Sequence, residues 1–228
     1  MLLSGTLSSE SLFNISMRHP KLTLEFCCFF ILLPGLLAFY DIRSSIFIIL
    51  WVLCFMSMHW LHKHTDYKLR QDWNAAALTW PALRTIFLRF GLLAALLTLF
   101  TFLHDPEKLF SFPRDNFSKW LMVMALYPAL SVLPQEIIFR SLMFRRYAPI
   151  FTSGKAMLLA SALTFGWAHI VMHTWISVTF SAIGGVIFAS TYARTKSLAA
   201  VFLEHTLYGC FIFTVGLGWY FYHANGIH

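Results

Sequence analysis

Long apolar runs recur along the whole chain, and no other feature limits its possible folds so strongly. We expect seven membrane-spanning segments, at residues 22–40, 44–61, 85–103, 120–146, 155–173, 175–193 and 198–222. A helix needs about 20 apolar residues to cross the hydrocarbon core of a bilayer. The chain is 58% hydrophobic and only 12% charged, whereas soluble domains have about 25% charged residues. These properties predict a multi-pass membrane protein and exclude a soluble globular domain.

The apolar runs have a helical or uniformly apolar pattern, and none alternates with the two-residue period of a membrane β-barrel. We therefore predict an all-α fold, a polytopic membrane helical bundle of about seven to eight transmembrane helices. We expect one integrated membrane domain, in which residues 1–117 supply the N-terminal helices and residues 118–222 form the core. Prolines 34, 128 and 134 should distort their helices where neighbouring groups bond the freed backbone.

Lysine and arginine residues gather in alternate connections between the apolar runs. The richer set holds Arg18, Lys21, Lys63, Lys68, Arg70, Arg84, Arg89, Arg145, Arg146, Lys155, Arg194 and Lys196, and the poorer set holds Arg43, Lys108, Arg114 and Lys119. This bias predicts a cytoplasmic N-terminus and an outer C-terminus. We further expect the membrane to be a bacterial cytoplasmic (inner) membrane. The charge bias also accounts for the net charge of +7, so we expect the lipid bilayer and no nucleic acid as a partner. Residues 1–20 lack a basic segment leading into an apolar core, so no cleavable signal peptide is expected.

Ionisable side chains inside the apolar runs are the candidates for a functional site. Such groups cost about 2.5–3.5 kcal/mol at the bilayer centre on insertion scales and usually face a cavity or a partner. They are Glu25, Glu136, Arg140, His169, His173, Glu204 and His205. At about 1.5 Å per residue from the cytoplasmic basic residues, Glu136, His169 and His205 lie about 15, 21 and 13–14 Å deep. We expect this carboxylate and these two imidazoles to converge in space.

Structural roles compete with functional ones for each of these residues. Glu136 and Arg140 are four residues apart on one helix face, so they can form an ion pair. Such a pair could also serve only to hold the helix bundle together. His169 fits a hydrogen-bonded core histidine. Glu25 can extend to the membrane surface from the end of its span, and His173 lies near the outer interface, where water solvates it.

Three short motifs, taken in order, resemble one family. Gln135 to Arg140 (QEIIFR) is similar to an E-E-x-x-x-R motif, Phe165 to His169 (FGWAH) is similar to F-x-x-x-H, and His205 stands in a last apolar helix. The resemblance is to the CPBP family of intramembrane proteases, which includes the CAAX prenyl endopeptidases. It covers about residues 118–215, and the N-terminal hundred residues show little similarity to the family. Together the motifs mark residues 118–222 as the CPBP-like core.

Two positions depart from the family pattern. Gln135 stands where the family has the first glutamate, which is usually assigned as the general base. Gly209 stands four residues after His205, where the family usually has asparagine or aspartate. The general-base role therefore falls to Glu136 or is lost.

The resemblance implies an intramembrane endopeptidase that hydrolyses a membrane-anchored peptide or protein substrate. In this hypothesis Glu136 activates a water molecule that His169 positions, and Arg140 orients Glu136. His205 and Gln135 donate hydrogen bonds to the oxyanion. No cofactor is favoured, because the arginine beside Glu136 opposes cation binding; a zinc form would use Glu136, His169 and His205 as ligands.

Two other functions stay open at this point. A catalytically inactive scaffold or binding protein would keep the protease-like fold and lose the chemistry through the two departures. A proton-coupled transporter would use the same polar groups at membrane depth, but the internal repeats common in transporters are not apparent.

Overall fold

The computed structural model describes residues 19–41 and 45–222. Within these ranges, seven helical segments are long and apolar enough to cross a membrane: Pro20–Phe39, Ile46–His64, Trp80–His104, Phe117–Arg146, Gly154–Met172, Trp175–Thr195 and Leu198–Val215. The described residues contain no strand. The all-α, multi-span prediction is confirmed. Arg18 and Arg43, which we assigned to opposite sets of connections, lie outside the described residues.

Several of these spans are built from shorter pieces. In chain order the elements are α2 (Pro20–Cys27), η1 (Cys28–Leu32), α3 (Leu33–Phe39), α4 (Ile46–His64), α5 (Leu69–Trp73), η3 (Ala75–Ala77), α6 (Trp80–His104), η4 (Pro106–Lys108), α7 (Ser111–Asp115), α8 (Phe117–Tyr127), η5 (Pro128–Val132), α9 (Leu133–Glu136), η6 (Ile137–Leu142), α10 (Met143–Arg146), η7 (Ala148–Ile150), α11 (Gly154–Ala168), η8 (His169–Met172), α12 (Trp175–Thr195), α13 (Leu198–Val215) and α14 (Trp219–Tyr222). Elements η1, η5 and η6 are π-helical, and the other η elements are 3-10 helices.

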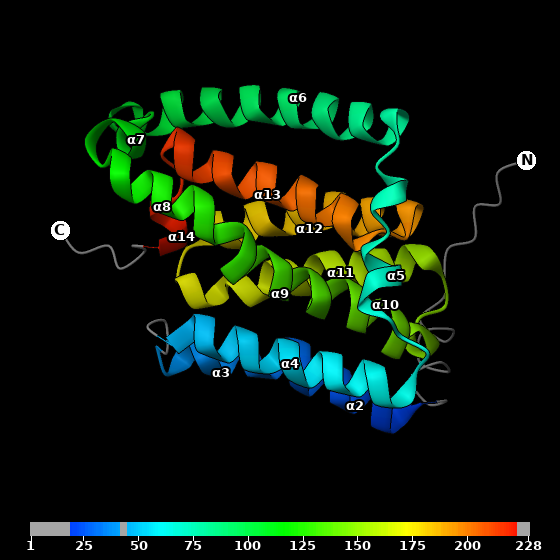
Figure 1. Cartoon of the computed structure of the whole chain (residues 1–228). Helices are drawn as coiled ribbons and strands as arrows, with labels where there is room; N and C mark the ends of the chain where they lie inside the picture. Colours follow the sequence, from blue (N-terminus) through cyan, green and yellow to red (C-terminus); the bar gives the residue numbers. More distant parts are fainter. Residues whose placement is uncertain (1–18, 42–44, 223–228) are drawn as a thin grey trace, which may run out of the picture.

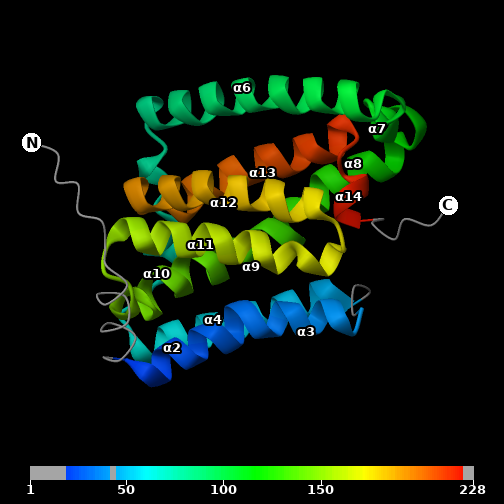
Figure 2. The same cartoon turned by 180° about the vertical axis from the view of Figure 1, so that it is seen from behind.

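The helices form a central group with further helices on two sides (Figures 1 and 2). The centre holds α11, α12, α13 and the broken fourth span from α8 to α10. The helices α2, α3 and α4 cover one side, and α6 crosses the opposite side. Successive spans run in opposite directions, so α2 begins and α14 ends at opposite ends of the bundle.

A widened turn precedes Pro134 in the fourth span. The N–H of Leu133 donates to the carbonyl of Pro128, five residues back, as in a π-helix. Pro134 has no N–H for the carbonyl of Leu130, four residues earlier. The indole Nε1 of Trp51 in α4 donates to that carbonyl at 3.1 Å. The neighbouring helix α4 thus donates a hydrogen bond to the freed backbone carbonyl, as the sequence predicted. The π-helical turn η1 likewise precedes Pro34 in the first span.

The middle of the fourth span is its most deeply buried part. All six residues of η6 are buried, and a helix buried all round lies inside a larger bundle. The π-helical turn begins directly after Glu136. Such turns occur often at functional sites, and this one places Glu136 and Arg140 at the centre of the molecule.

The seventh span is shorter than predicted. The helix α13 ends at Val215, whereas the sequence predicted a helix to residue 222, and that prediction was wrong. Gly216 has a φ of 104°, a left-handed conformation that commonly ends helices and that glycine adopts at little cost. The N–H of Phe110 donates to the carbonyl of Val215 at 3.3 Å, so the connection before α8 packs against this helix end.

A buried carboxylate anchors the connection between α4 and α6. Asp72 in α5 is 3% exposed and accepts hydrogen bonds from Ser141, from Nη2 of Arg145 at 2.7 Å and from the hydroxyl of Tyr192 at 2.7 Å. Ser141 and Arg145 belong to the fourth span and Tyr192 to α12. The cluster therefore fixes the connection to one end of the bundle, and the sequence did not predict it.

Glu25 has a structural role, as one of the readings of the sequence proposed. Both of its carboxylate oxygens accept hydrogen bonds from the guanidinium of Arg146, and the hydroxyl of Tyr147 donates to Oε1 at 2.6 Å. The guanidinium also lies over the ring of Trp60 at 3.9 Å. This cluster joins the first and second spans to the end of the fourth.

Candidate functional site

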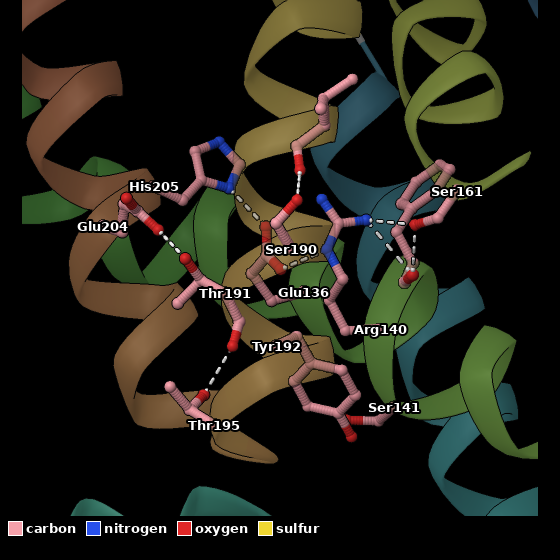
Figure 3. Close-up of polar contacts among 12 residues, drawn as sticks. Glu136, Arg140, Ser141, Ser161, Ser190, Thr191, Tyr192, Thr195, Glu204 and His205 are labelled. Carbon is pink, nitrogen blue, oxygen red and sulfur yellow. Dashed lines mark hydrogen bonds and ion pairs between the residues drawn. The ribbon is translucent and has the colours of Figure 1, made fainter. Parts of the chain in front are cut away.

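Glu136 and His205 meet at the centre of the bundle. Glu136 is the last residue of α9 and His205 lies in α13, and their side chains point toward one another (Figure 3). The distance from Nδ1 of His205 to Oε1 of Glu136 is 2.7 Å. Glu136 is 0% exposed and His205 is 5% exposed. Two of the three residues expected to converge are therefore in direct contact.

Arg140 places a compensating charge beside Glu136. Its Nε lies 3.2 Å from Oε2 of Glu136, and both side chains are 0% exposed. The two atoms are close enough for an ion pair, although their orientation does not make a hydrogen bond. The Nη1 of Arg140 donates to Ser161 at 2.8 Å and to the carbonyl of Phe139 at 3.2 Å, and the guanidinium lies 5.2 Å from the centre of the Phe165 ring. These contacts fix Arg140 on the side of Glu136 away from His205.

A mostly apolar cavity of about 890 Å³ lies beside this pair. Its polar lining includes Tyr127, Gln135, His169 and His205, whereas Glu136 does not reach it. From the sequence we expected Glu136 to contact the reacting water directly. In the structure the carboxylate lies behind His205, because α9 turns Gln135 toward the cavity and Glu136 toward the core.

The ring of His205 is held between aromatic side chains. It stacks on Phe188, with ring centres 4.4 Å apart and an angle of 18°, and it meets Phe165 edge to face at 5.5 Å. Its Nε2 lies 3.4 Å from the hydroxyl of Tyr127. The nitrogen facing Glu136 and the nitrogen facing Tyr127 are thus both fixed by packing.

His169 lines the same cavity from η8. Its Nδ1 lies 2.8 Å from the carbonyl oxygen of Phe165, which can only accept, so Nδ1 carries the proton and Nε2 keeps a lone pair. Its ring packs against Phe165 at 5.0 Å, as that of His205 also does. His173 is separate from the cavity lining and lies 3.8 Å from Asp41 at the end of the bundle.

Gln135 is in the cavity wall next to Glu136. Its Nε2 donates to the hydroxyl of Ser131 at 2.8 Å, which leaves the second hydrogen on Nε2 unused. Within the described part of the chain, its Oε1 has no hydrogen-bond partner. The side chain therefore retains a free donor and a free acceptor.

The zinc form considered from the sequence needs three ligands around one point. Among residues 19–41 and 45–222, no group of three or more histidine, cysteine, aspartate or glutamate side chains is arranged to hold a metal ion. In particular, Nδ1 of His205 already contacts Glu136, so Glu136, His169 and His205 do not fit a zinc ion in this arrangement, and we derive no step through a metal.

Two residues near the site were missed in the sequence. Tyr127 carries the hydroxyl that faces His205, and nothing distinguishes it from the other aromatic residues of its span. Arg89 was counted in a connection but lies inside α6, where its Nη2 is 2.9 Å from Oε1 of the fully buried Glu204. Glu204 also accepts a hydrogen bond from Thr191 (Figure 3). Through Arg89 and Thr191 it ties α6 and α12 to the helix that carries His205. The position of Arg89 inside an apolar run was the feature of the sequence that could have indicated a buried partner.

A family model described as type II CAAX prenyl endopeptidase Rce1-like matches residues 117–211. No curated protein and no solved structure gives a significant match. The matched segment begins with the fourth span and extends into α13. It contains the five residues to which the sequence-based hypothesis gave catalytic roles: Gln135, Glu136, Arg140, His169 and His205. Residues 117–211 are thus an Rce1-like region, consistent with the CPBP family to which the sequence motifs pointed.

Proposed function

We propose that this protein is an intramembrane endopeptidase that hydrolyses a peptide bond of a membrane-anchored substrate, with His205 as its acid–base group and Glu136 as the carboxylate that positions His205. The observation that carries the proposal is the 2.7 Å contact between Nδ1 of His205 and Oε1 of Glu136, next to a cavity that His205 lines. The Rce1-like match supports the protease class. In this proposal residues 118–222 carry the chemistry, and residues 1–117 supply helices that flank it.

The carboxylate fixes the proton on His205. Because a carboxylate only accepts, Nδ1 of His205 is the donor and Nε2 is left with a lone pair. Nε2 then takes a proton from a water molecule in the cavity, and Glu136 stabilises the imidazolium that forms. Arg140 pairs with Glu136 and orients it from behind. Glu136 and Arg140 are accordingly positioning residues, and His205 is the catalytic base.

The remaining polar groups of the cavity complete the reaction. The Nε2 lone pair of His169 accepts the second hydrogen of the same water and so aims its oxygen at the scissile carbonyl carbon. The free Nε2–H of Gln135 donates to the oxyanion. As the C–N bond breaks, the proton on His205 passes to the leaving amine nitrogen. General acid–base transfer of this kind contributes about 10²–10⁴-fold in rate.

The substrate class follows from the position of the cavity. It lies among membrane-spanning helices, and most of its lining is apolar. A peptide held in the bilayer by an apolar anchor reaches it without leaving the membrane. The proposed setting is a bacterial inner membrane with the N-terminus in the cytoplasm, supported by the charge bias of the connections.

The test compares variants of the purified protein in lipid nanodiscs. The probe is a fluorogenic farnesylated CAAX peptide, the substrate class named in the family description. A parallel mass-spectrometric comparison of membrane peptides in cells expressing wild type or Glu136→Gln covers other substrates. We expect Glu136→Gln and His205→Ala to lose cleavage by about 10²–10⁴-fold, with an unchanged rate for His64→Ala, an exposed histidine at the end of α4. Cleavage of cellular substrates that survives both site variants would leave a non-catalytic scaffold as the better reading.

A carboxylate swap separates the two ways in which a glutamate can act. Gln135→Glu/Glu136→Gln moves the carboxylate from behind His205 into the cavity. Because His205 then loses its partner and Arg140 is left buried without a carboxylate, we expect the swap to stay as inactive as Glu136→Gln. Recovery of the wild-type rate by the swap would mean that a carboxylate acts directly on water, which contradicts the assignment of His205 as the catalytic base.

A further inference from the structure

We propose that the phenol hydroxyl of Tyr127 is a further catalytic group of this site, a hydrogen-bond donor to the oxyanion, and that Gly209 is the residue that makes room for it. The inference rests on the proposed function and extends it to two residues that the proposed mechanism does not use. It starts from the packing between the end of α8 and α13.

The ring of Tyr127 occupies the volume that a side chain at position 209 would need. A Cβ atom built on Gly209 would lie 2.3 Å from both the hydroxyl oxygen and Cε1 of Tyr127, and 2.5 Å from its Cζ. Atoms that are not bonded do not approach so closely. Any residue other than glycine at 209 therefore displaces the phenol, while glycine lets the hydroxyl lie directly against α13, one helical turn after His205.

The surroundings of Tyr127 hold its hydroxyl at the reaction centre. Its ring meets Phe213 edge to face at 5.4 Å, and its hydroxyl lies 3.4 Å from Nε2 of His205. Tyr127 lines the same cavity as Gln135 and His205. The phenol is thus at the cavity end of a chain of contacts that runs from Arg140 through Glu136 and His205.

The chain of donors gives the hydroxyl a role that changes during the reaction. Before water binds, the phenol hydrogen points at the single lone pair of Nε2 of His205. The reacting water displaces the phenol hydrogen there, because its own hydrogen must point at this lone pair, and Nε2 becomes a donor when it takes the proton. The hydroxyl hydrogen is then free to turn toward the oxyanion that forms on the carbonyl. No proton leaves Tyr127, and a donor appears at the moment when negative charge develops.

The test uses the removal of one oxygen atom. Tyr127→Phe keeps the ring in the space beside Gly209, so the fold is retained and only the donor is lost. The loss of one oxyanion donor costs about 10²–10³-fold in kcat, and we expect KM to stay within a few-fold of wild type. The matched control is Tyr67→Phe, which removes the hydroxyl of a buried tyrosine that is outside this cavity and has no hydrogen-bond partner among the described residues. We expect that variant to keep the wild-type rate.

Exchanging the two positions tests the geometry. Gly209→Asn alone should be inactive, because its side chain collides with the phenol. Tyr127→Ala/Gly209→Asn places an amide donor in the vacated volume, and we expect at least a tenfold higher kcat than for Tyr127→Ala. Equal rates for the double variant and Tyr127→Ala, together with a wild-type rate for Tyr127→Phe, would overturn the proposal.

A readout without substrate keeps this proposal apart from the proposed function. The ¹⁵N resonance of Nε2 in His205 should move to higher frequency in Tyr127→Phe, which removes the donor, and should stay in place in Tyr67→Phe. An unmoved resonance rules out the contact on which the proposal depends, whether or not the protein cleaves the peptide. If Glu136→Gln is inactive and Tyr127→Phe is fully active, only the role of Tyr127 is wrong; if Glu136→Gln is active, the proposed function itself is wrong.

Discussion

The buried carboxylate of Asp72 allows a stability prediction that is independent of the cavity. Asp72→Asn keeps the shape of the side chain and replaces one acceptor oxygen with an NH₂ group. In the folded protein Oδ2 accepts from Ser141, and Oδ1 accepts from Arg145 and Tyr192, so the NH₂ group faces at least one of these three donors. A donor then points at a donor in a site that is only 3% exposed, and the asparagine oxygen cannot serve all three partners.

The expected cost follows from the number of bonds and their exposure. Hydrogen bonds to charged groups contribute about 1.5–3 kcal/mol each. The side chain of Arg145 is 33% exposed, so water screens its ion pair with Asp72. We therefore take the contribution of this hydrogen bond to the free energy of unfolding at the lower end of that range. We expect Asp72→Asn to lower the free energy of unfolding by about 2–4 kcal/mol. For a chain of this size, each kcal/mol lowers the Tm by about 2–4 °C, so the decrease should be about 4–16 °C.

Thermal unfolding in lipid nanodiscs, followed by tryptophan fluorescence, measures this change. Asp66→Asn is the matched control, because Asp66 lies in the same connection and is exposed; surface substitutions change stability by about 0.5 kcal/mol or less. A double-mutant cycle of Asp72→Asn with Tyr192→Phe should show a coupling of about 0.5–3 kcal/mol. Additive losses, or a melting temperature for Asp72→Asn equal to that of Asp66→Asn, would refute the account of Asp72 as an anchor.

Three further predictions concern stability away from the reaction. Arg89→Gln should destabilise the protein by about 3 kcal/mol, because it leaves the fully buried Glu204 without its cation, and adding Glu204→Gln should recover part of the loss in thermal melts. Gly185→Val should cost about 1–3 kcal/mol of overpacking, since a Cβ there would lie 2.9 Å from the backbone of Ala162, whereas Gly91→Ala, with open space around it, should be tolerated in the same assay. Burial raises the pKa of Tyr67 to about 12, above its unfolded value of about 10. The unfolded chain therefore loses this proton first as pH rises, and the free energy of unfolding should fall between these two pH values. Thermal melts at alkaline pH should show a smaller fall for Tyr67→Phe than for wild type.

The spans were predictable from the sequence because the hydrophobic effect acts on composition over a whole helix. Where a single residue determines the end of a helix, the prediction of that boundary failed. Gly216 ends α13, and the apolar residues after it do not indicate that the helix stops there. The convergence of Glu136 and His205 was predicted from depth alone. Depth does not specify the direction in which a side chain points around its helix axis, and the π-helical turns of the fourth span change that direction without changing composition.

Contacts between helices were the least predictable feature. Tyr127 and Gly209 are ordinary residues in their own helices, and their relation exists only after α8 has packed on α13. The same holds for Asp72, whose partners lie on two spans far along the chain. Charged residues inside apolar runs, such as Arg89 and Glu204, do signal that partners are required, but the sequence does not say which ones.

The placement of the carboxylate has a physical reason that also bears on the chemistry. An ionised side chain facing a mostly apolar cavity within a membrane would lack a counter-ion. Behind His205, Glu136 has Arg140 at 3.2 Å and an imidazole N–H at 2.7 Å, so its charge is compensated on two sides. Near His205 the cavity wall then presents the amide of Gln135 and the imidazole rings of His169 and His205, and the carboxylate that lines the cavity, Asp41, lies exposed at the end of the bundle. In the proposed mechanism position 135 does not need a carboxylate, because Glu136 supplies the charge from within the core and His205 transmits the effect of that charge to the cavity.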